Sequence, residues 1–278
     1  MNEAKLVFYA GSTLLEGPRW SDELSLLLCV SIEQERIFLI DEEGQFIRTF
    51  KTHGQVGFAL FKDKETIIYA AYDGVYELDI ATGKDKFLFL ANTDKTLRYN
   101  DGDYAPNGRI LLGTTGYKRF AQGENCLYSA NADGTDIKKI IENTSISNGI
   151  SFSPDNKYLY FIDTPTKKVY RYEYDLKIGT CRLDKHVVEI TGSGVPDGMC
   201  IDKDGNIYVA EWGGSRVCKW NPTTGKCLEE YHVPVRNVSS CAIGGKNHDM
   251  LYITTAAHDD GTESEPAAGG LFKVYLLE

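Results

Sequence analysis

Long apolar runs and basic runs are both missing from this chain. No segment approaches the roughly 18 consecutive apolar residues of a membrane-spanning helix. The opening segment, MNEAKLVFYA, has neither the basic region nor the apolar core of a secretory signal peptide. Lys and Arg are scattered, and the formal net charge is −10. Because an acidic chain repels polyanions and anionic membrane surfaces, we expect no nucleic-acid or membrane partner. The lack of a signal peptide and of a membrane-spanning segment leads us to expect a cytoplasmic protein.

Paired cysteine motifs and common hydrolase signatures are missing as well. The seven cysteines include no C-x-x-C pair and fall mostly in apolar, strand-like runs: Cys29, Cys126, Cys181, Cys200, Cys218, Cys227 and Cys241. We therefore predict reduced thiols that pack as small core residues, and neither a disulfide framework nor a zinc site. No G-x-S-x-G or H-E-x-x-H motif occurs, which argues against a serine nucleophile and a zincin-type metal site.

Helical periodicity is scarce, and a strand-rich unit recurs instead. Apolar residues alternate with a period close to 2 in RIFLID, KYLYFID and NIYVAEW, between turns rich in Gly, Asn and Asp. Residues 147–175 and 195–222 share one pattern: x-[ND]-G, an apolar strand, an Asp-containing turn, a second strand and an aromatic third strand. Weaker copies, which make the steps 40 to 49 residues long, begin near Glu16, Val56, Asn100 and Ser240.

Repeats of this length and strand content predict a β-propeller. Units of about 40–50 residues with about four strands each are typical of propeller blades. Six units fit the length, so we predict an all-β, six-bladed propeller with four-stranded antiparallel blades that forms a single domain over residues 1–278. AKLVFYA precedes the first unit, and LFKVYLLE ends the last unit after its third strand. Pairing these two segments would close the ring and cover two exposed edges.

Four polar residues share one phase of this repeat. The innermost strands of a propeller surround its axis, so residues of equal phase converge near one end. Glu16, Asn100, Asn148 and Asp197 have this phase, each just before a glycine or one residue removed from it. Taken singly, Asn-Gly and Asp-Gly are more often turn formers than ligands. Taken together, two carboxylates and two carboxamides offer oxygen ligands to a hard divalent cation, which would offset the cost of their burial.

At these positions the chain resembles the senescence marker protein, gluconolactonase and luciferin-regenerating enzyme family. The resemblance rests on ordered motifs along nearly the whole chain, including LEGPRW, RYNDGDYAPNGRILLGT, SNGISFSPDNKYLYFIDT, VPDGMCIDKDGNIYVAEWGGSRV and AAGGLFKV. It implies a six-bladed propeller that binds one divalent cation, often calcium, and hydrolyses lactones, typically of sugar acids. It also implies metal ligands at Glu16, Asn148 and Asp197, and substrate contacts from Arg98 and Asn100.

The resemblance and the residue types together predict a gluconolactonase-like, metal-dependent hydrolase. A cation on the lactone carbonyl oxygen would stabilise the negative charge that develops when water attacks. Asp197 would orient or deprotonate that water, Glu16 would chiefly hold the metal, and Arg98 would hydrogen-bond sugar hydroxyls or an acidic group. Because coordination weakens a base, whether Asp197 acts as base, ligand or both stays open. Calcium is the first expectation for the ion, with zinc, manganese and magnesium as alternatives.

Two other functions are compatible with the same residues. A metal that polarises a lactone can polarise other esters, so a broader esterase or phosphotriesterase is one alternative. A non-catalytic propeller that binds calcium or another protein is the second, because this fold often serves as a scaffold. In the leading hypothesis the partner is a small lactone, and the chain acts as a monomer or a dimer.

Several residues near the expected site keep two interpretations. Asp101 either supports the site from behind or caps its turn. The loop at 116–125 is expected to border the site, with Glu124 interpreted as a solvated acid rather than a substrate contact. Trp20 either walls the pocket or packs between blades. His258 is interpreted as an ordinary loop histidine.

Overall fold

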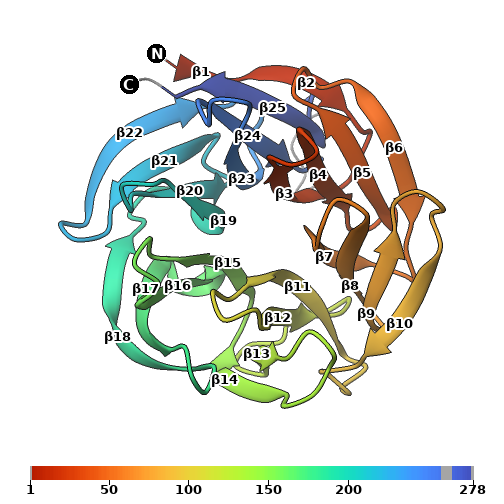
Figure 1. The fold of residues 1–278 in the computed structure, drawn as a ribbon. Helices are drawn as coiled ribbons and strands as arrows, with labels where there is room; N and C mark the ends of the chain where they lie inside the picture. The colour runs from red at the N-terminus through yellow and green to blue at the C-terminus, as the bar shows by residue number, and fades with distance from the viewer. Residues whose placement is uncertain (1, 258–264, 277–278) are drawn as a thin grey trace.

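Strands arranged around a central axis account for nearly all of the structure (Figure 1). This computed structural model describes residues 2–257 and 265–276. Over those residues the strands form six sheets, numbered here as blades I to VI in chain order. The predicted all-β, six-bladed propeller with antiparallel blades is therefore confirmed. No helix in the described part of the chain is long and apolar enough to cross a membrane.

Each blade contains four strands that follow one another from the axis outward. Blade I contains β3 (Leu15–Ser21), β4 (Leu26–Ser31), β5 (Arg36–Asp41) and β6 (Phe46–Lys51). Blade II contains β7 (Val56–Phe61), β8 (Thr66–Ala71), β9 (Gly74–Asp79) and β10 (Asp85–Phe89). Blade III contains β11 (Leu97–Tyr104), β12 (Ile110–Gly116), β13 (Asn125–Ala130) and β14 (Lys138–Thr144).

The other three blades repeat this order with two additions from the N-terminus. Blade IV contains β15 (Ser147–Phe152), β16 (Tyr158–Asp163), the short 3-10 helix η1 (Thr164–Thr166), β17 (Lys168–Asp175) and β18 (Thr180–Glu189). Blade V contains β19 (Val195–Ile201), β20 (Ile207–Trp212), β21 (Arg216–Asn221) and β22 (Lys226–His232), with β1 (Asn2–Glu3) beyond β22. Blade VI contains β23 (Val238–Gly244), β24 (Met250–Thr255), β25 (Gly270–Tyr275) and, outermost, β2 (Lys5–Tyr9).

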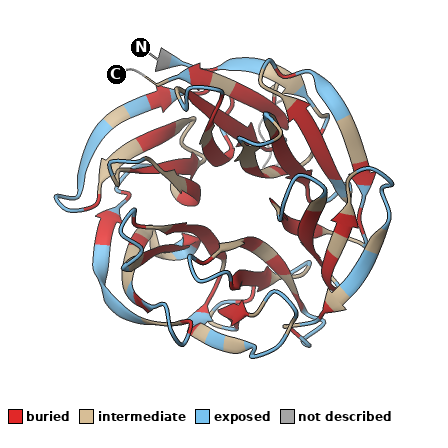
Figure 2. Ribbon diagram, in the orientation of Figure 1, coloured by how far each residue is buried: buried red, intermediate tan, exposed pale blue. Residues whose placement is uncertain are grey.

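Burial decreases from the axis outward, as Figure 2 shows. In β8, with the sequence TIIYAA, every residue after Thr66 is buried. In β6, with the sequence FIRTFK, only Phe50 is buried. Second strands such as β8 are covered on both faces by neighbouring blades and are therefore largely apolar, whereas outer strands meet solvent.

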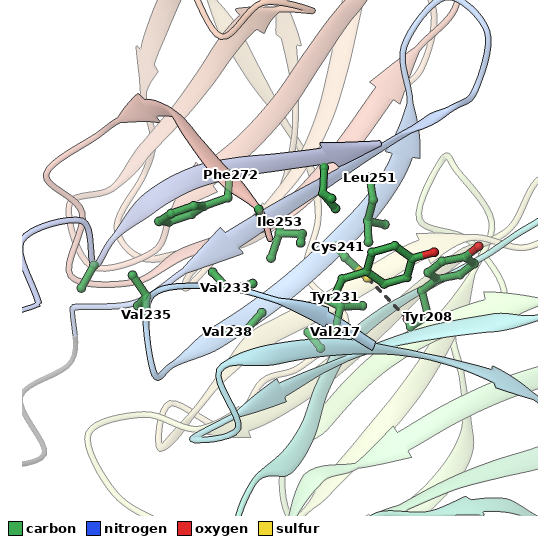
Figure 3. Packing of buried hydrophobic residues seen from close by; sticks show 14 residues of the cluster. Tyr208, Val217, Tyr231, Val233, Val235, Val238, Cys241, Leu251, Ile253 and Phe272 are labelled. Atoms are coloured by element: carbon green, nitrogen blue, oxygen red, sulfur yellow. Dashed lines mark hydrogen bonds between the residues drawn. The ribbon is translucent and has the colours of Figure 1, made fainter. Parts of the chain in front are cut away.

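Apolar side chains of adjacent blades interdigitate to form the core. Between blades V and VI the buried cluster includes Tyr208, Tyr231, Leu251 and Phe272 (Figure 3). The Cys241 thiol lies in the same cluster and donates a hydrogen bond to the carbonyl oxygen of Tyr208, 3.4 Å away. None of the seven cysteines, all of which lie in the described residues, forms a disulfide, as the sequence predicted.

The N-terminal segment closes the ring. β2 pairs antiparallel with β25, with Leu6 opposite Phe272, so the predicted closure of the last blade is confirmed. β1 adds a contact that the sequence did not indicate, because it pairs in parallel with β22 of blade V. Ala4, between the two strands, is buried and donates its backbone N–H to the carbonyl oxygen of His232 at 2.8 Å. The segment therefore joins blades V and VI at their outer edges (Figure 1).

All six innermost strands carry a β-bulge at the same phase. The register with the second strand shifts at positions 16/19, 56/58, 99/102, 148/150, 196/199 and 238/240. A bulge leaves extra residues unpaired and re-aims their side chains. The repeat phase identified in the sequence therefore corresponds to a ring of bulges around one end of the axis.

Candidate functional site

The four polar residues of the repeat phase lie at these bulges. Glu16 and Asn148 border the bulges of β3 and β15, and Asn100 and Asp197 lie within those of β11 and β19. The Nδ2 of Asn148 donates a hydrogen bond to Oδ1 of Asp197. The Nδ2 of Asn100 donates to the carbonyl oxygen of Ser147 at 3.1 Å. Residues from blades I, III, IV and V thus meet near the axis, as the spacing of the repeat predicts.

Glycines make this close meeting of strands feasible. Gly149 follows Asn148 with φ +36°, and a Cβ there would lie 2.4 Å from Cδ1 of Ile162 and 2.9 Å from the carbonyl oxygen of Asp197. Gly198 follows Asp197, and a Cβ there would lie 2.0 Å from Oγ of Ser240. The backbones that carry the polar residues therefore approach one another more closely than residues with side chains would allow.

The carboxyl groups at the centre of the site resist ionisation in the protein alone. Burial and the nearby carboxylates of Glu16 and Asp101 raise the pKa of Asp197 well above its usual range. Burial and Asp101 raise the pKa of Glu16 to about 8, although the N–H of Gly17 and nearby arginines act in the opposite direction. Asn148 and Asp197 are only 4% and 6% exposed, so water compensates little of this charge. A positive ion at this position would relieve the mutual repulsion of the carboxylates.

The donor set fits a hard divalent cation. Glu16 and Asp197 contribute carboxylate oxygens and Asn148 contributes a carboxamide, which are the groups that such ions prefer. In the structure the Asn148 amide donates to Asp197 and, at 3.2 Å, to Oγ1 of Thr164. Holding an ion would require this amide to make a half-turn, so that Oδ1 instead of Nδ2 faces the carboxylates.

Arg98 lies beside this group and is held in place by its neighbours in the chain. Its Nη1 donates to Oδ1 of Asn100 at 2.9 Å and to the carbonyl oxygen of Tyr99 at 2.8 Å. Burial lowers the pKa of Arg98 to about 10, against the opposing influence of Glu16, Glu33 and Asp197. The guanidinium therefore stays charged at neutral pH and partly balances the two carboxylates.

Arg19 and Asp103 complete the charged cluster, and the sequence reasoning missed both. Nη2 of Arg19 lies 3.3 Å from Oδ1 of Asp101 and 3.0 Å from the carbonyl oxygen of Gly102. Asp101 also accepts a hydrogen bond from the N–H of Gly102 at 2.8 Å, so it caps its turn and anchors Arg19. Burial raises the pKa of Asp103, and Arg19 opposes that rise. Arg19 stands three residues after Glu16 in LEGPRW, and this short spacing could have indicated that it lies near the site.

The structure shows how most of the residues with two interpretations lie around the site. Tyr117, in the loop predicted to border the site, lies near enough to influence Arg98. Glu124 pairs with Arg119 of its own loop at 2.6 Å, and its side chain is 52% exposed. Trp20 stacks on Tyr252 of blade VI with ring centroids 5.8 Å apart, so it packs between blades. His258 lies outside the described residues.

Fold and site together define a six-bladed propeller with a polar, axial site. Residues 14–257 match the family described as SMP-30/Gluconolactonase/LRE-like region, and the chain belongs to this family. A relative from Bacillus subtilis (strain 168), YvrE, is named as a sugar lactone lactonase. It is 35% identical over 267 residues, covering 94% of this chain and 90% of that protein. Regucalcin of Homo sapiens is 31% identical over 273 residues, covering 94% of this chain and 90% of that protein. The solved structure of a calcium-binding protein, regucalcin, from Agrobacterium tumefaciens superposes with a TM-score of 0.87 at 25% identity, covering 100% of this chain and 97% of that one.

Proposed function

We propose that the protein is a divalent-metal-dependent hydrolase that opens a small sugar-acid lactone. The observation that carries this proposal is the meeting of Glu16, Asn148 and Asp197 at one end of the axis, where the side chain of Asp197 is buried, Glu16 is partly buried, and the pKa of both carboxyl groups is raised. The chain belongs to a family whose description includes gluconolactonase, which supports lactone hydrolysis as the reaction class. The name of the Bacillus relative supports the substrate class, and the calcium-binding Agrobacterium structure supports calcium as the first choice of ion.

In this proposal each residue has a distinct task. A divalent cation held by Glu16, Asn148 and Asp197 would polarise the lactone carbonyl and stabilise the developing oxyanion. Asp197 orients the attacking water or accepts its proton. Arg98 donates hydrogen bonds to the hydroxyl groups or to an acidic group of the substrate. Asn100 accepts a hydrogen bond from the Arg98 guanidinium and keeps it in position, and its side chain would also contact the lactone.

Metal removal and one carboxylate substitution test the proposal. Protein stripped with a chelator should lose hydrolysis of gluconolactone and related aldonolactones, and one of calcium, zinc, manganese or magnesium should restore it. Asp197→Asn should lower kcat/KM by at least about 100-fold, because it removes a ligand charge and the candidate base together. The measurement is acid release followed with a pH indicator, corrected for spontaneous lactone hydrolysis.

Asp204→Asn is the matched control, because Asp204 is exposed in the turn after β19. It should keep full activity. Undiminished hydrolysis after metal removal or in Asp197→Asn would contradict the mechanism. Faster turnover of aryl esters or organophosphates than of lactones would favour the broader esterase. Tight calcium binding without turnover of any ester would favour a non-catalytic calcium-binding propeller.

A further inference from the structure

A second cluster of potential metal ligands lies in blade V, away from the axis. The sulfur atoms of Cys218 and Cys227 and a carboxylate oxygen of Glu230 all lie within 4.8 Å of one another. Cys218 belongs to β21 and is buried, whereas Cys227 and Glu230 belong to the outer strand β22 and are exposed. The axial residues Glu16, Asn148 and Asp197 are not part of this group.

A β-bulge brings the three side chains to one face of the blade. Cys227 and Glu230 are three positions apart, so in a regular strand they would point to opposite faces. The register between β21 and β22 shifts by one residue between Lys219 and Trp220, which places Glu230 directly opposite Cys218 and Cys227 opposite Trp220. Since residues 218 and 220 share a face, all three potential ligands lie on that face.

A buried carboxylate provides an independent sign that a cation belongs there. Glu211 of β20 is fully buried, and its Oε1 has no hydrogen-bond partner. Its Oε2 is held by Arg216 at 3.0 Å, and the same arginine holds Oε2 of Glu230 at 3.0 Å. Arg216 thus binds one oxygen of each glutamate and links the buried Glu211 to Glu230 of the cluster.

We propose that Cys218, Cys227 and Glu230 form a structural site for a zinc-type divalent cation. Thiolate sulfur and carboxylate oxygen are both ligands of Zn²⁺, and thiolates select against calcium and magnesium. Binding converts two thiols to thiolates and releases their two protons to solvent. The ion would join the two outer strands of blade V. The sequence pattern predicted core thiols without a zinc site, because the bulge is not visible in the spacing.

Cobalt(II) provides a probe that reports on sulfur ligands directly. Reduced protein titrated with Co²⁺ should develop a thiolate-to-cobalt charge-transfer band that saturates at a single equivalent, and Zn²⁺ should displace it. The axial site offers only oxygen atoms and cannot produce this band. Cys227→Ser should weaken Co²⁺ binding by more than about 100-fold, because even outer-sphere partners of a metal contribute 10–100-fold. Glu230→Gln should weaken it as well.

Two variants serve as controls. Cys181→Ser removes a thiol from blade IV outside the cluster, and Asp197→Asn disables the axial site; both should keep the band and its affinity. Circular dichroism of Cys227→Ser should match the unaltered protein, because this side chain is exposed. The absence of a charge-transfer band, or its retention at full strength in Cys227→Ser, would overturn the proposal. Loss of the band in Asp197→Asn would overturn it too.

Discussion

The Arg19 guanidinium links two blades that are not neighbours. It starts in blade I, passes blade II and reaches Asp101 and the carbonyl oxygen of Gly102 in blade III. The side chains of Arg19 and Asp101 are only 18% and 12% exposed, so their attraction is weakly screened. Removing one member of such a pair costs more than the pair contributes, because the remaining charge stays buried.

We expect Arg19→Met to reduce the free energy of unfolding by about 3 kcal/mol. The substitution keeps most of the volume but leaves Asp101 and Asp103 without their cation. Adding Asp101→Asn to the same chain should recover part of the loss. Urea unfolding followed by tryptophan fluorescence measures Arg19→Met, Asp101→Asn and the double variant. Additive losses in the double variant would show that the pair is not coupled.

Sequence reasoning identified the residues whose position depends on the repeat. One phase, which recurs every 40 to 49 residues, groups four polar residues that include Asn100, and the family resemblance selects Glu16, Asn148 and Asp197 among them as metal ligands. The contact between Arg19 and Asp101 spans 82 residues and depends on how far a flexible side chain reaches across the axis. No period in the sequence encodes that distance, so the contact required coordinates.

Among the elements, the bulged inner strands place the most specific demands on the sequence. The bulge of β15 requires a positive φ at Gly149 and leaves no space for a Cβ between Ile162 and the backbone of Asp197. A single added methyl group therefore meets two obstacles, backbone strain and steric overlap. Since Asn148 precedes this glycine, any adjustment would also move a candidate ligand.

Gly149→Ala should lower the free energy of unfolding by more than about 3 kcal/mol. Gly213→Ala is the matched control, because Gly213 has φ +76° with no atom within 4 Å of an added Cβ; it should cost only about 1 kcal/mol. Urea unfolding gives both values, and calcium titration by calorimetry should show weaker binding for Gly149→Ala alone. Equal losses in the two variants would show that steric overlap is unimportant at Gly149.

Strand alternation predicted the elements well but failed where a bulge inverts it. Runs such as KYLYFID correspond to β16 because a period of 2 is a direct consequence of strand geometry. Cys227 and Glu230 share a face only because the ladder slips by one residue. A slip of this kind depends on twist and on neighbouring strands, and the local sequence gives no sign of it.

For the whole molecule, ring closure depends on a short N-terminal segment. Val7, Phe8 and Ala10 pack against the buried cluster between blades VI and I, and β2 covers the edge of β25. The repeat predicted this pairing because the last unit contains only three strands. It did not predict β1, since two residues in a parallel pair leave no pattern in the sequence.

Deletion of residues 1–10 should destabilise the protein by at least about 3 kcal/mol, because two large apolar side chains lose their burial. It should also promote aggregation through the uncovered edge of β25. Deletion of residues 1–3 removes only β1 and serves as the control, with a much smaller loss. We expect one cooperative thermal transition for the full chain, in keeping with the predicted single domain. Calorimetry and light scattering test both expectations, and an unchanged midpoint after the longer deletion would contradict them.

The residues at the six bulges are arranged asymmetrically around the axis. Blades II and VI use this phase differently from the other four: a Cβ on Gly57 would lie 2.5 Å from the carbonyl carbon of Tyr99, and Ser239 donates a hydrogen bond to the carbonyl oxygen of Leu15 at 2.6 Å. Around the axis, the order is therefore carboxylate, glycine, amide, amide, carboxylate, serine. This order reads differently clockwise and anticlockwise. A chiral ligand and its mirror image cannot make the same contacts with it, so the frame built from six similar blades can distinguish stereoisomers.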